Sequence, residues 1–354
     1  MALLKTKDLG YKYFVLSLLL LVSSGNTIAQ QAEVEAIPLP SELAHLPNEL
    51  TIYSTPNPNI PEYIDNKEKV AWKHSTIIKA DQIIRVVETG AYLLYYGNWW
   101  KRATFGVKET KELFDSKSLD MRPGDSLTYE KNWRVEPWSR SGWNFWYVKA
   151  VNAKGDTLMG YDILYTAGTL EDGTQLLPML SKTSTIQWTG KGEGDYTLTG
   201  TINEFSGRIA YNNGTLSDLS VNINMDSIAH EIPTLIEHLK SKDFFHVSKY
   251  SGATFTAESM IQIEGNQWEI EGELCLRGKC NQELWTATVI DTDTTVILDY
   301  KTEINRTKYN VNYASTVKPD KNYVILDTIE LSGRFEFQKD YPGSNPFNSV
   351  EAKD

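Results

Sequence analysis

The chain has 354 residues, of which 41% are hydrophobic and 23% charged, and this composition is typical of a globular protein with room for two domains. The formal net charge of −11 excludes nucleic acid as an expected partner, because an acidic chain repels phosphate backbones and anionic lipid surfaces.

Residues 1–29 have the features of a signal peptide. Three lysines precede the apolar run 14–22, and Ala29 fits a cleavage site before Gln30. A run of nine residues is too short to span a membrane, although an uncleaved anchor stays open as the alternative. No cysteine follows the run, so we expect no lipoprotein modification there. We therefore expect a periplasmic or secreted protein without stable membrane insertion, with a net charge of about −13 after cleavage.

Residues 30–70 form a proline-rich leader in which no periodic pattern predicts an element. Residues 71–180 predict a β-rich, sandwich-like domain of no family that we identify, with one short helix at 108–114. Its predicted strands, separated by turn signals, are 75–79, 82–87, 92–96, 126–129, 145–150 and 160–165.

This domain is rich in tryptophan. The indoles belong to Trp72, Trp99, Trp100, Trp133, Trp138, Trp143 and Trp146. Trp138, Trp143 and Trp146 could form a stacking platform for sugar rings, which would make the domain a carbohydrate- or surface-binding module. They could equally fill a sandwich core, since indoles bury a large apolar area. The sequence leaves both interpretations open.

The remainder of the chain, residues 186–338, predicts a second all-β domain, followed by a tail at 339–354. A loop or bulge is expected at 190–194. The predicted strands, which alternate apolar and polar residues, are 196–202, 204–211, 219–226, 254–263, 268–276, 294–303, 308–313 and 324–337. Eight or nine antiparallel strands with one continuous apolar face most simply close into a barrel.

One stretch interrupts these strands. Residues 233–239 are compatible with a short helix, and the adjacent Phe244 and Phe245 follow a charged turn. This segment predicts a helical plug that leads into the strand at 254–263. Alternation then places one set of residues on a single face of that strand, namely Phe255, Ala257, Ser259, Ile261 and Ile263.

The stretch 238–259, HLKSKDFFHVSKYSGATFTAES, resembles the YceI-like family of small periplasmic lipid-binding β-barrels. Residues 204–209, 221–228, 272–278 and 304–313 also resemble family segments, in the family's order. The resemblance covers residues 186–338 and implies a lipocalin-like barrel whose apolar interior holds a long isoprenoid or quinone-like lipid. The chain departs from the family at 279–283, where the expected inward apolar position is Glu283.

The resemblance, with the alternation, predicts a set of ligand-binding residues. They are Phe205, Ile223, Phe244, Phe245, Phe255, Ala257, Ile261, Trp268, Ile270, Leu274, Trp285 and Arg306. The small residues on the same inward parity, Ala257, Ser259, Gly272 and Ala287, favour open volume, but a filled barrel stays possible. Arg277 and Arg306 match the family pattern, either as rim ion pairs or as contacts to a lipid headgroup.

Catalysis finds little support in the sequence. The five histidines are dispersed without metal-ligand spacing, and no phosphate loop, nucleophile elbow or carboxylate pair occurs. We therefore predict a binding protein with a hydrophobic small-molecule ligand, without a metal or a cofactor other than a bound lipid. A hydrolase is the minority alternative.

Cys275 and Cys280 are the two cysteines of the chain. If Arg277 and Gly278 form the loop of a tight hairpin, the two cysteines face each other, with Cβ atoms about 4.5–5.5 Å apart. A disulfide would then staple the hairpin in an oxidising compartment. Cys275 shares its parity with Glu273, so the disulfide is expected on the solvent face.

Overall fold

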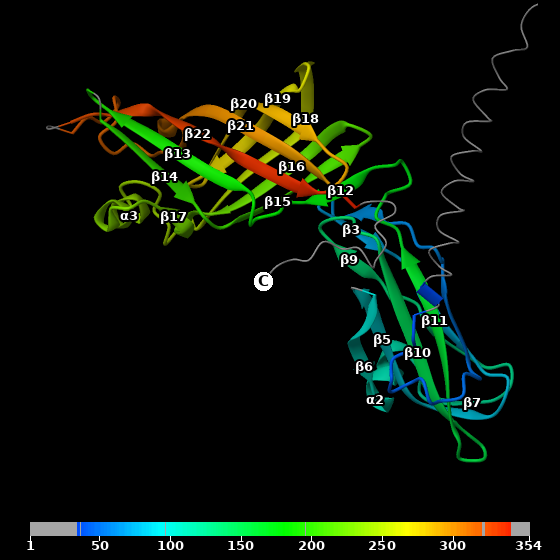
Figure 1. Ribbon diagram of the computed structural model, residues 1–354. Helices are drawn as coiled ribbons and strands as arrows, with labels where there is room; N and C mark the ends of the chain where they lie inside the picture. Colours follow the sequence, from blue (N-terminus) through cyan, green and yellow to red (C-terminus); the bar gives the residue numbers. More distant parts are fainter. Residues whose placement is uncertain (1–33, 36, 96, 195, 321–322, 341–354) are drawn as a thin grey trace, which may run out of the picture.

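The computed structural model describes residues 34–35, 37–95, 97–194, 196–320 and 323–340. The predicted signal peptide and nearly all of the predicted tail lie outside these residues. Figure 1 shows two elongated parts built almost entirely of strands, which meet near β3 and β12. Within the described part of the chain, no helix is long and apolar enough to cross a membrane.

The N-terminal part contains three small antiparallel sheets, in the orders β1-β4-β8, β11-β10-β5-β6 with β7 beside β5, and β2-β3-β9. The strands are β1 (Thr51–Thr55), β2 (Glu62–Ile64), β3 (Lys69–Trp72), β4 (Ser75–Lys79), β5 (Ile84–Tyr95), β6 (Asn98–Phe105), β7 (Asp120–Met121), β8 (Ser126–Tyr129), β9 (Arg134–Glu136), β10 (Gly142–Asn152) and β11 (Thr157–Thr166). One helix, α2 (Val107–Leu113), follows β6.

The short helix and the β-rich character of this part are as predicted, but the leader is not irregular. Residues 30–70 contain β1, β2 and the start of β3, because their prolines lie between the strands rather than inside them; Pro56, Pro58 and Pro61 all fall between β1 and β2. The core lies between the sheets: Ile78 of β4 packs in one apolar cluster with Val86 of β5.

The C-terminal part is one curled, half-barrel sheet of eleven strands, in the order β12-β15-β16-β18-β19-β20-β21-β22-β13-β14-β17. The strands are β12 (Gln175–Pro178), β13 (Thr185–Gly192), β14 (Thr197–Ile202), β15 (Phe205–Asn212), β16 (Thr215–Asn224), β17 (Ile228–Ala229), β18 (Gly252–Glu264), β19 (Gln267–Leu276), β20 (Lys279–Asp291), β21 (Thr295–Asn305) and β22 (Ile325–Gln338). The residues that follow β12 hydrogen-bond to two separate strands of this sheet. The Met179 N–H donates to the Gly207 carbonyl of β15 at 2.9 Å, and the Leu180 N–H donates to the Glu336 carbonyl of β22 at 2.7 Å.

The helical elements of this part lie at one end of the curled sheet. The predicted plug is confirmed as α3 (Pro233–Lys240), which begins with proline at a position where no N–H is needed. η1 (Met225–Ser227) precedes it. The strand predicted at 308–313 is wrong: the chain forms the 3₁₀ turn η2 (Arg306–Tyr309), because the Asn305 side chain accepts from the Thr307 N–H and starts a helical turn.

The two parts contact each other through an apolar cluster and a clamp. Trp72 of β3 shares the cluster with Leu176 of β12 and Ala210 of β15. The clamp is the guanidinium of Arg208, which donates to the carbonyls of Glu68 at 2.7 Å, Pro137 at 2.9 Å and Lys67.

Candidate functional site

The inner face of the curled sheet is mostly apolar. Its strands alternate buried inward residues with exposed outward ones, most regularly in β19 and β20. Of the residues predicted to bind a ligand, the ones that the structure buries together in this core are Phe244, Phe255, Ala257, Trp268, Ile270, Leu274 and Trp285. Phe205, Ile223 and Phe245 pack against the same core and remain partly exposed. Their role in binding a ligand stays a prediction.

Five aromatic rings form a row across this inner face, which we call the aromatic ladder. Phe255 and Trp285 stack with ring centroids 3.8 Å apart, Trp285 and Tyr300 at 5.2 Å, and Tyr300 and Phe335 at 4.4 Å. Phe205 lies at the end of the row, and its ring centroid is 6.2 Å from that of Phe335. Burial raises the pKa of the Tyr300 hydroxyl far above its usual range, so this ring stays neutral.

The small inward residues serve the ladder rather than leaving open volume. A Cβ on Gly272 would lie 2.7 Å from the ring of Phe255 and 2.6 Å from the Thr256 carbonyl oxygen. Glycine is therefore required there, because Phe255 leans across this position to reach Trp285. Ser259, expected to line the interior, is exposed. The middle of the half-barrel is thus filled by stacked rings.

The apolar core becomes accessible at a groove of about 480 Å³. Phe205 and Ile223, which are neighbours across the β15–β16 ladder, line it together with Ala253. Asn224 lies at its rim and donates to the Glu204 carboxylate at 2.7 Å. Two predicted ligand-binding residues thus lie where the inner face meets solvent.

The plug closes the end of the half-barrel opposite the N-terminal part. Phe244 packs edge-on against His238, with ring centroids 5.0 Å apart, and against Tyr313 at 5.2 Å. Several further apolar side chains pack against this core and are only partly buried: Leu198, Leu235, Ile236, Phe245, Ile325, Ile329 and Leu331.

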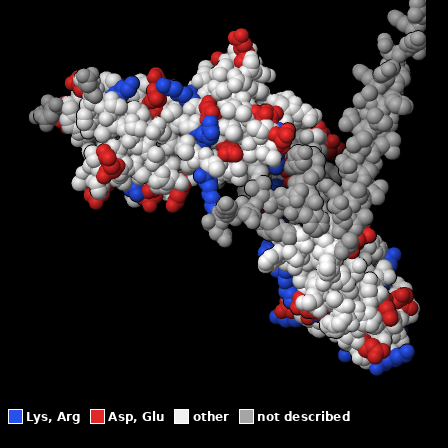
Figure 2. Space-filling view, viewed as in Figure 1, with Lys and Arg blue, Asp and Glu red and all other residues white. Residues whose placement is uncertain are grey.

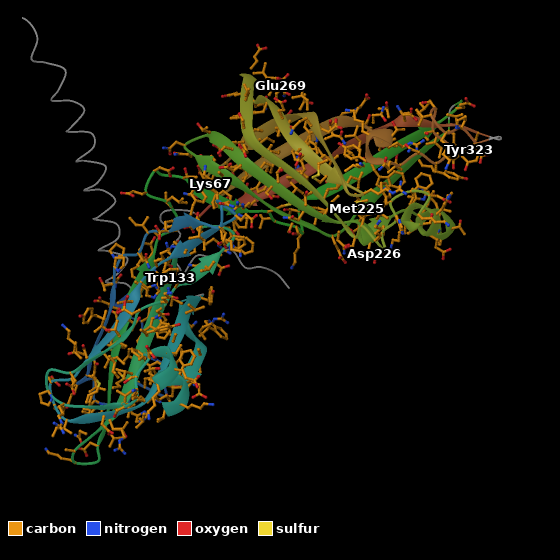
Figure 3. The ribbon with its side chains drawn as sticks, turned by 180° about the vertical axis from the view of Figure 1, so that it is seen from behind. Lys67, Trp133, Met225, Asp226, Glu269 and Tyr323 are labelled. Carbon is orange, nitrogen blue, oxygen red and sulfur yellow. A yellow bond between two sulfur atoms is a disulfide. The ribbon has the colours of Figure 1, made fainter. Side chains whose placement is uncertain are left out.

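The prediction for Ile261 is wrong. A register shift between Thr256 and Ser259 in the β18–β19 pairing marks a bulge, which reverses the alternation in the second half of β18. Met260 is consequently buried, whereas Ile261 is 62% exposed. Figure 3 shows Glu269, the pairing partner of Ile261, on the protruding hairpin of β18 and β19.

Glu283 points inward, as the family pattern would place an apolar residue, and only 8% of it is exposed. Its carboxylate accepts from the Tyr309 hydroxyl at 2.7 Å and lies 3.5 Å from Lys308 Nζ. Burial and this carboxylate both raise the pKa of Tyr309 above its usual range. One wall near the plug is therefore polar, but its charge is paired.

Arg306 does not offer a headgroup contact. Its guanidinium donates to four backbone carbonyls, those of Val311 at 2.7 Å, Ile325 at 2.9 Å, Tyr313 at 3.0 Å and Leu326 at 3.1 Å. Only 3% of the residue is exposed, so it ties η2 to the start of β22. Arg277 likewise donates to the carbonyls of Lys242, at 2.6 Å, and Asn310.

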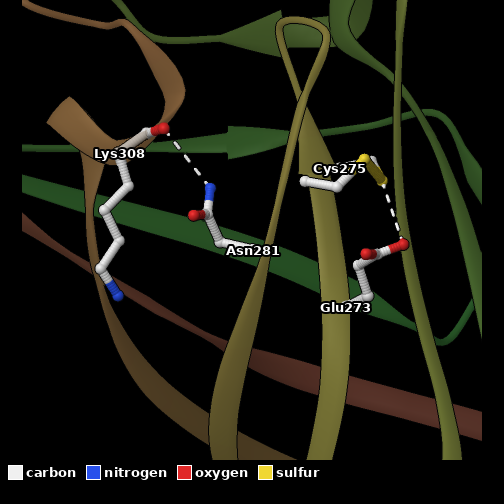
Figure 4. Close-up of a disulfide and its surroundings, with 5 residues drawn as sticks. Glu273, Cys275, Asn281 and Lys308 are labelled. Atoms are coloured by element: carbon white, nitrogen blue, oxygen red, sulfur yellow. Dashed lines mark hydrogen bonds between the residues drawn. A yellow bond between two sulfur atoms is a disulfide. The ribbon is translucent and has the colours of Figure 1, made fainter.

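Cys275 and Cys280 form a disulfide across the hairpin of β19 and β20, and they are direct pairing partners. Arg277 and Gly278 form the two-residue loop, both with positive φ, which this kind of turn requires. In Figure 4 the Glu273 carboxylate lies beside the sulfurs, 3.6 Å from Cys275 Sγ. Glu273 and the two cysteines could be read as metal ligands, but both sulfurs are held in the disulfide and neither is a thiolate.

The three tryptophans considered as a sugar platform are not together. Trp143 is buried in one core cluster, Trp146 packs against a second and Trp138 against a third. Trp146 stacks on Phe105 with ring centroids 6.5 Å apart. These indoles pack the N-terminal part, and they offer no shared flat surface.

Three further members of the inner face are absent from the predicted set: Trp188, Tyr300 and Phe335. The alternation of Val296, Leu298 and Tyr300 with their more exposed neighbours was a usable signal for Tyr300. For Trp188 the signal was weaker, because no strand was predicted over β13, where a bulge between Gly190 and Gly192 disturbs the pattern.

Comparison with known proteins identifies the C-terminal part. A family model described as the YceI-like domain matches residues 179–337. A UPF0312 protein of Vibrio cholerae is 32% identical over 84 residues, which are 23% of this chain and 44% of the relative. Protein YceI of Salmonella arizonae is 34% identical over 83 residues, 23% of this chain and 43% of the relative. The chain thus spans less than half the length of these curated relatives.

Solved structures resemble part of the chain. Burkholderia cenocepacia BcnA gives a TM-score of 0.41 at 18% identity and covers 45% of this chain and 98% of its own. A structure described as a polyisoprenoid binding domain from Saccharophagus degradans gives a TM-score of 0.37 at 13% identity and covers 46% of this chain and 97% of its own. The match to the family model covers residues 179–337, which we call the YceI-like domain, and the N-terminal part lies outside it.

Proposed function

We propose that the YceI-like domain at residues 179–337 holds a long isoprenoid or quinone-like lipid chain for transport, storage or sequestration. The observation that carries the proposal is the continuous apolar inner face of the half-barrel, which reaches solvent at the groove lined by Phe205 and Ile223. Burying a lipid chain on such a face gains about 0.8 kcal/mol per CH₂ before ordering costs, so few polar contacts are needed.

The remaining features support binding rather than chemistry. Two buried charged residues near the inner face are paired with protein groups, Glu283 with the Tyr309 hydroxyl and Arg306 with backbone carbonyls. Export is part of the proposal: residues 1–29 have the pattern of a signal peptide, and the exposed disulfide suits an oxidising compartment.

The test measures lipid occupancy of the full chain. Native mass spectrometry of protein purified from cells, with lipid extraction, should detect a bound apolar lipid. Ala257 is 2% exposed and packs beside Gly272 and Phe255, so the larger side chain of Ala257→Trp should disrupt this packed part of the inner face and reduce lipid occupancy at least tenfold.

The matched control is the neighbouring Thr256→Trp, because Thr256 is exposed on the outer face and its replacement should leave occupancy unchanged. Far-UV circular dichroism checks that both variants keep their β structure. Undiminished lipid binding by a folded Ala257→Trp variant would contradict the proposed interior.

A further inference from the structure

The loop of the β19–β20 hairpin lies against two segments at the plug end of the half-barrel. Arg277, in this loop, donates at 2.6 Å to the carbonyl of Lys242, within residues 241–250, which follow α3 and which we call the plug loop. Its guanidinium also donates to the carbonyl of Asn310, which follows η2. One side chain of the hairpin thus joins the plug loop to the segment between β21 and β22.

The neighbouring residue of the hairpin extends this contact. A Cβ on Gly278 would lie 2.8 Å from the ring of Tyr250, the last residue of the plug loop, so a larger residue would displace the ring. Gly278 and Arg277 both have positive φ, at 73° and 51°, which a tight two-residue loop requires. The shape of this loop therefore sets the contact between the hairpin and the plug loop.

The plug loop completes the apolar core at its end of the half-barrel. Its residues Phe244 and Val247 are both 7% exposed and belong to the core cluster. Lys240, just before the loop, pairs with Asp226 at 3.0 Å, but both side chains reach solvent, and such a pair contributes little to stability. Displacement of the plug loop from Arg277 would uncover part of the apolar inner face.

The disulfide fixes the hairpin directly behind this loop. Cys275 and Cys280 are pairing partners, and only the pair of Leu276 and Lys279 separates them from the loop. Cys280 is exposed and Cys275 is half-buried, so the bond is open to attack from solvent. Breaking the bond would free the strand ends that hold Arg277 in position.

The carboxylate of Glu273 suits this disulfide to reversible reduction. It lies 3.6 Å from Cys275 Sγ, a sulfur that carries no hydrogen while the disulfide is intact. A reduced Cys275 thiol can donate to this carboxylate, which stabilises the reduced form. The same negative charge disfavours a Cys275 thiolate and so slows re-oxidation, which proceeds through the thiolate.

We propose that the Cys275–Cys280 disulfide is a redox site, reduced by a protein dithiol, that controls the hold of Arg277 on the plug loop. A thiolate of the reductant attacks one cysteine sulfur and forms a mixed disulfide, while the other cysteine leaves as a thiolate and takes up a proton. The second thiol of the reductant then loses its proton and displaces the first cysteine in the same way. The chain gains two thiols, and the reductant ends as a disulfide.

The consequence for lipid rests on the proposed function. With the bond reduced, the plug loop should leave its closed position more often, so a lipid should enter and leave the half-barrel faster. With the bond intact, the plug loop stays closed. The disulfide thus regulates the rate of lipid exchange rather than which lipid is held.

Hydrogen–deuterium exchange of the full chain tests the redox site without any lipid. Reduction of the wild type by dithiothreitol, a small dithiol, should speed amide exchange of residues 241–250 about 3- to 10-fold, because a short closed loop contributes only modestly to stability. Amide exchange in β10, in the N-terminal part, should not change. Intact mass after alkylation checks that two thiols have formed.

Three variants serve as controls. Cys275→Ser combined with Cys280→Ser should show the faster amide exchange without dithiothreitol and should not respond to it. Arg277→Ala should show the faster exchange with the disulfide intact, because the tie itself is removed. Arg334→Ala removes an exposed guanidinium of the same sheet and should leave the plug loop unchanged.

A second measurement follows ligand release. Protein loaded with diphenylhexatriene, a neutral apolar fluorophore, is mixed with excess cyclodextrin, and the loss of fluorescence is timed. Reduction should speed this loss about 3- to 10-fold in the wild type and should leave it unchanged in the double cysteine variant.

The outcomes separate the inference from the function on which it rests. Plug-loop amide exchange that is unchanged by reduction, or a disulfide that resists dithiothreitol, would overturn the redox site. Faster amide exchange with an unchanged release rate would overturn its control of lipid exchange and leave lipid binding intact. Failure of every form of the protein to take up the fluorophore would contradict the proposed function, whereas the amide exchange would still decide the redox site.

Discussion

Arg306 and Glu283 show how single polar residues are accommodated in an apolar half-barrel. Both are buried, and both are paired with protein groups: Arg306 with two carbonyls of the segment between β21 and β22 and two of β22, and Glu283 with the Tyr309 hydroxyl. Neither residue is available to a ligand, although the family pattern pointed to Arg306 and an expected inward position pointed to Glu283. At the scale of residues, these buried charged side chains stabilise the wall of the half-barrel.

Arg306→Ala should therefore destabilise the protein without a specific effect on lipid affinity. It leaves four buried carbonyls without their charged donor, and we expect a loss of about 3–5 kcal/mol in the free energy of unfolding, measured by urea denaturation. Arg334→Ala removes an exposed pair with Asp299 and should cost less than about 1 kcal/mol. Equal costs for the two changes would contradict the structural role of Arg306.

At the scale of elements, alternation located most strands of the half-barrel, because side chains alternate between the two faces with a period of two. Prediction from alternation failed where a bulge inserted one residue into a strand, and where a side chain accepted a hydrogen bond from the backbone and started a turn. The bulge before Ser259 moved Ile261 outward, and Asn305 turned the chain into η2 where a strand was expected. A single sequence gives no strong signal for either event.

Because of the bulge, we expect the effects of truncating Met260 and Ile261 to be the reverse of those that uninterrupted alternation would predict. Met260→Ala should lower the free energy of unfolding by about 2–3 kcal/mol, because Met260 is 7% exposed and its truncation leaves a cavity. Ile261→Ala should change it by less than about 1 kcal/mol, since Ile261 is largely exposed. Urea denaturation of both variants checks the register, and the reverse order would show that the bulge is absent.

At the scale of the whole molecule, the resemblance in the sequence predicted the YceI-like half but not its connection to the rest. Figure 2 shows acidic and basic side chains interspersed over the visible face of both parts, in line with a mixed surface. The contact between the parts depends on residues far apart in sequence, such as Arg208 and Glu68, which no local pattern links. In the leader, β1 pairs with the more distant β4, whereas β2 forms a local hairpin with β3.

Arg208→Ala should loosen this contact. The change removes the donor to three carbonyls of the N-terminal part, so we expect the two parts to unfold in separate transitions where the wild type shows one. Calorimetry checks this, and limited proteolysis should show faster cleavage between the parts. Lys191→Ala, at an exposed lysine of β13, is the control and should leave the transition single.

The pairing of β13 with β22 constrains the order in which the chain can assemble. Thr185 and Arg334 are hydrogen-bonded although 149 residues separate them, so β13 is synthesised long before β22. β13 can pair at once with β14, as β19 can with β20, but its other edge has no partner until β22 is made. Until the last strand of the sheet arrives, the backbone N–H and C=O groups of this edge are open to unintended strand pairing.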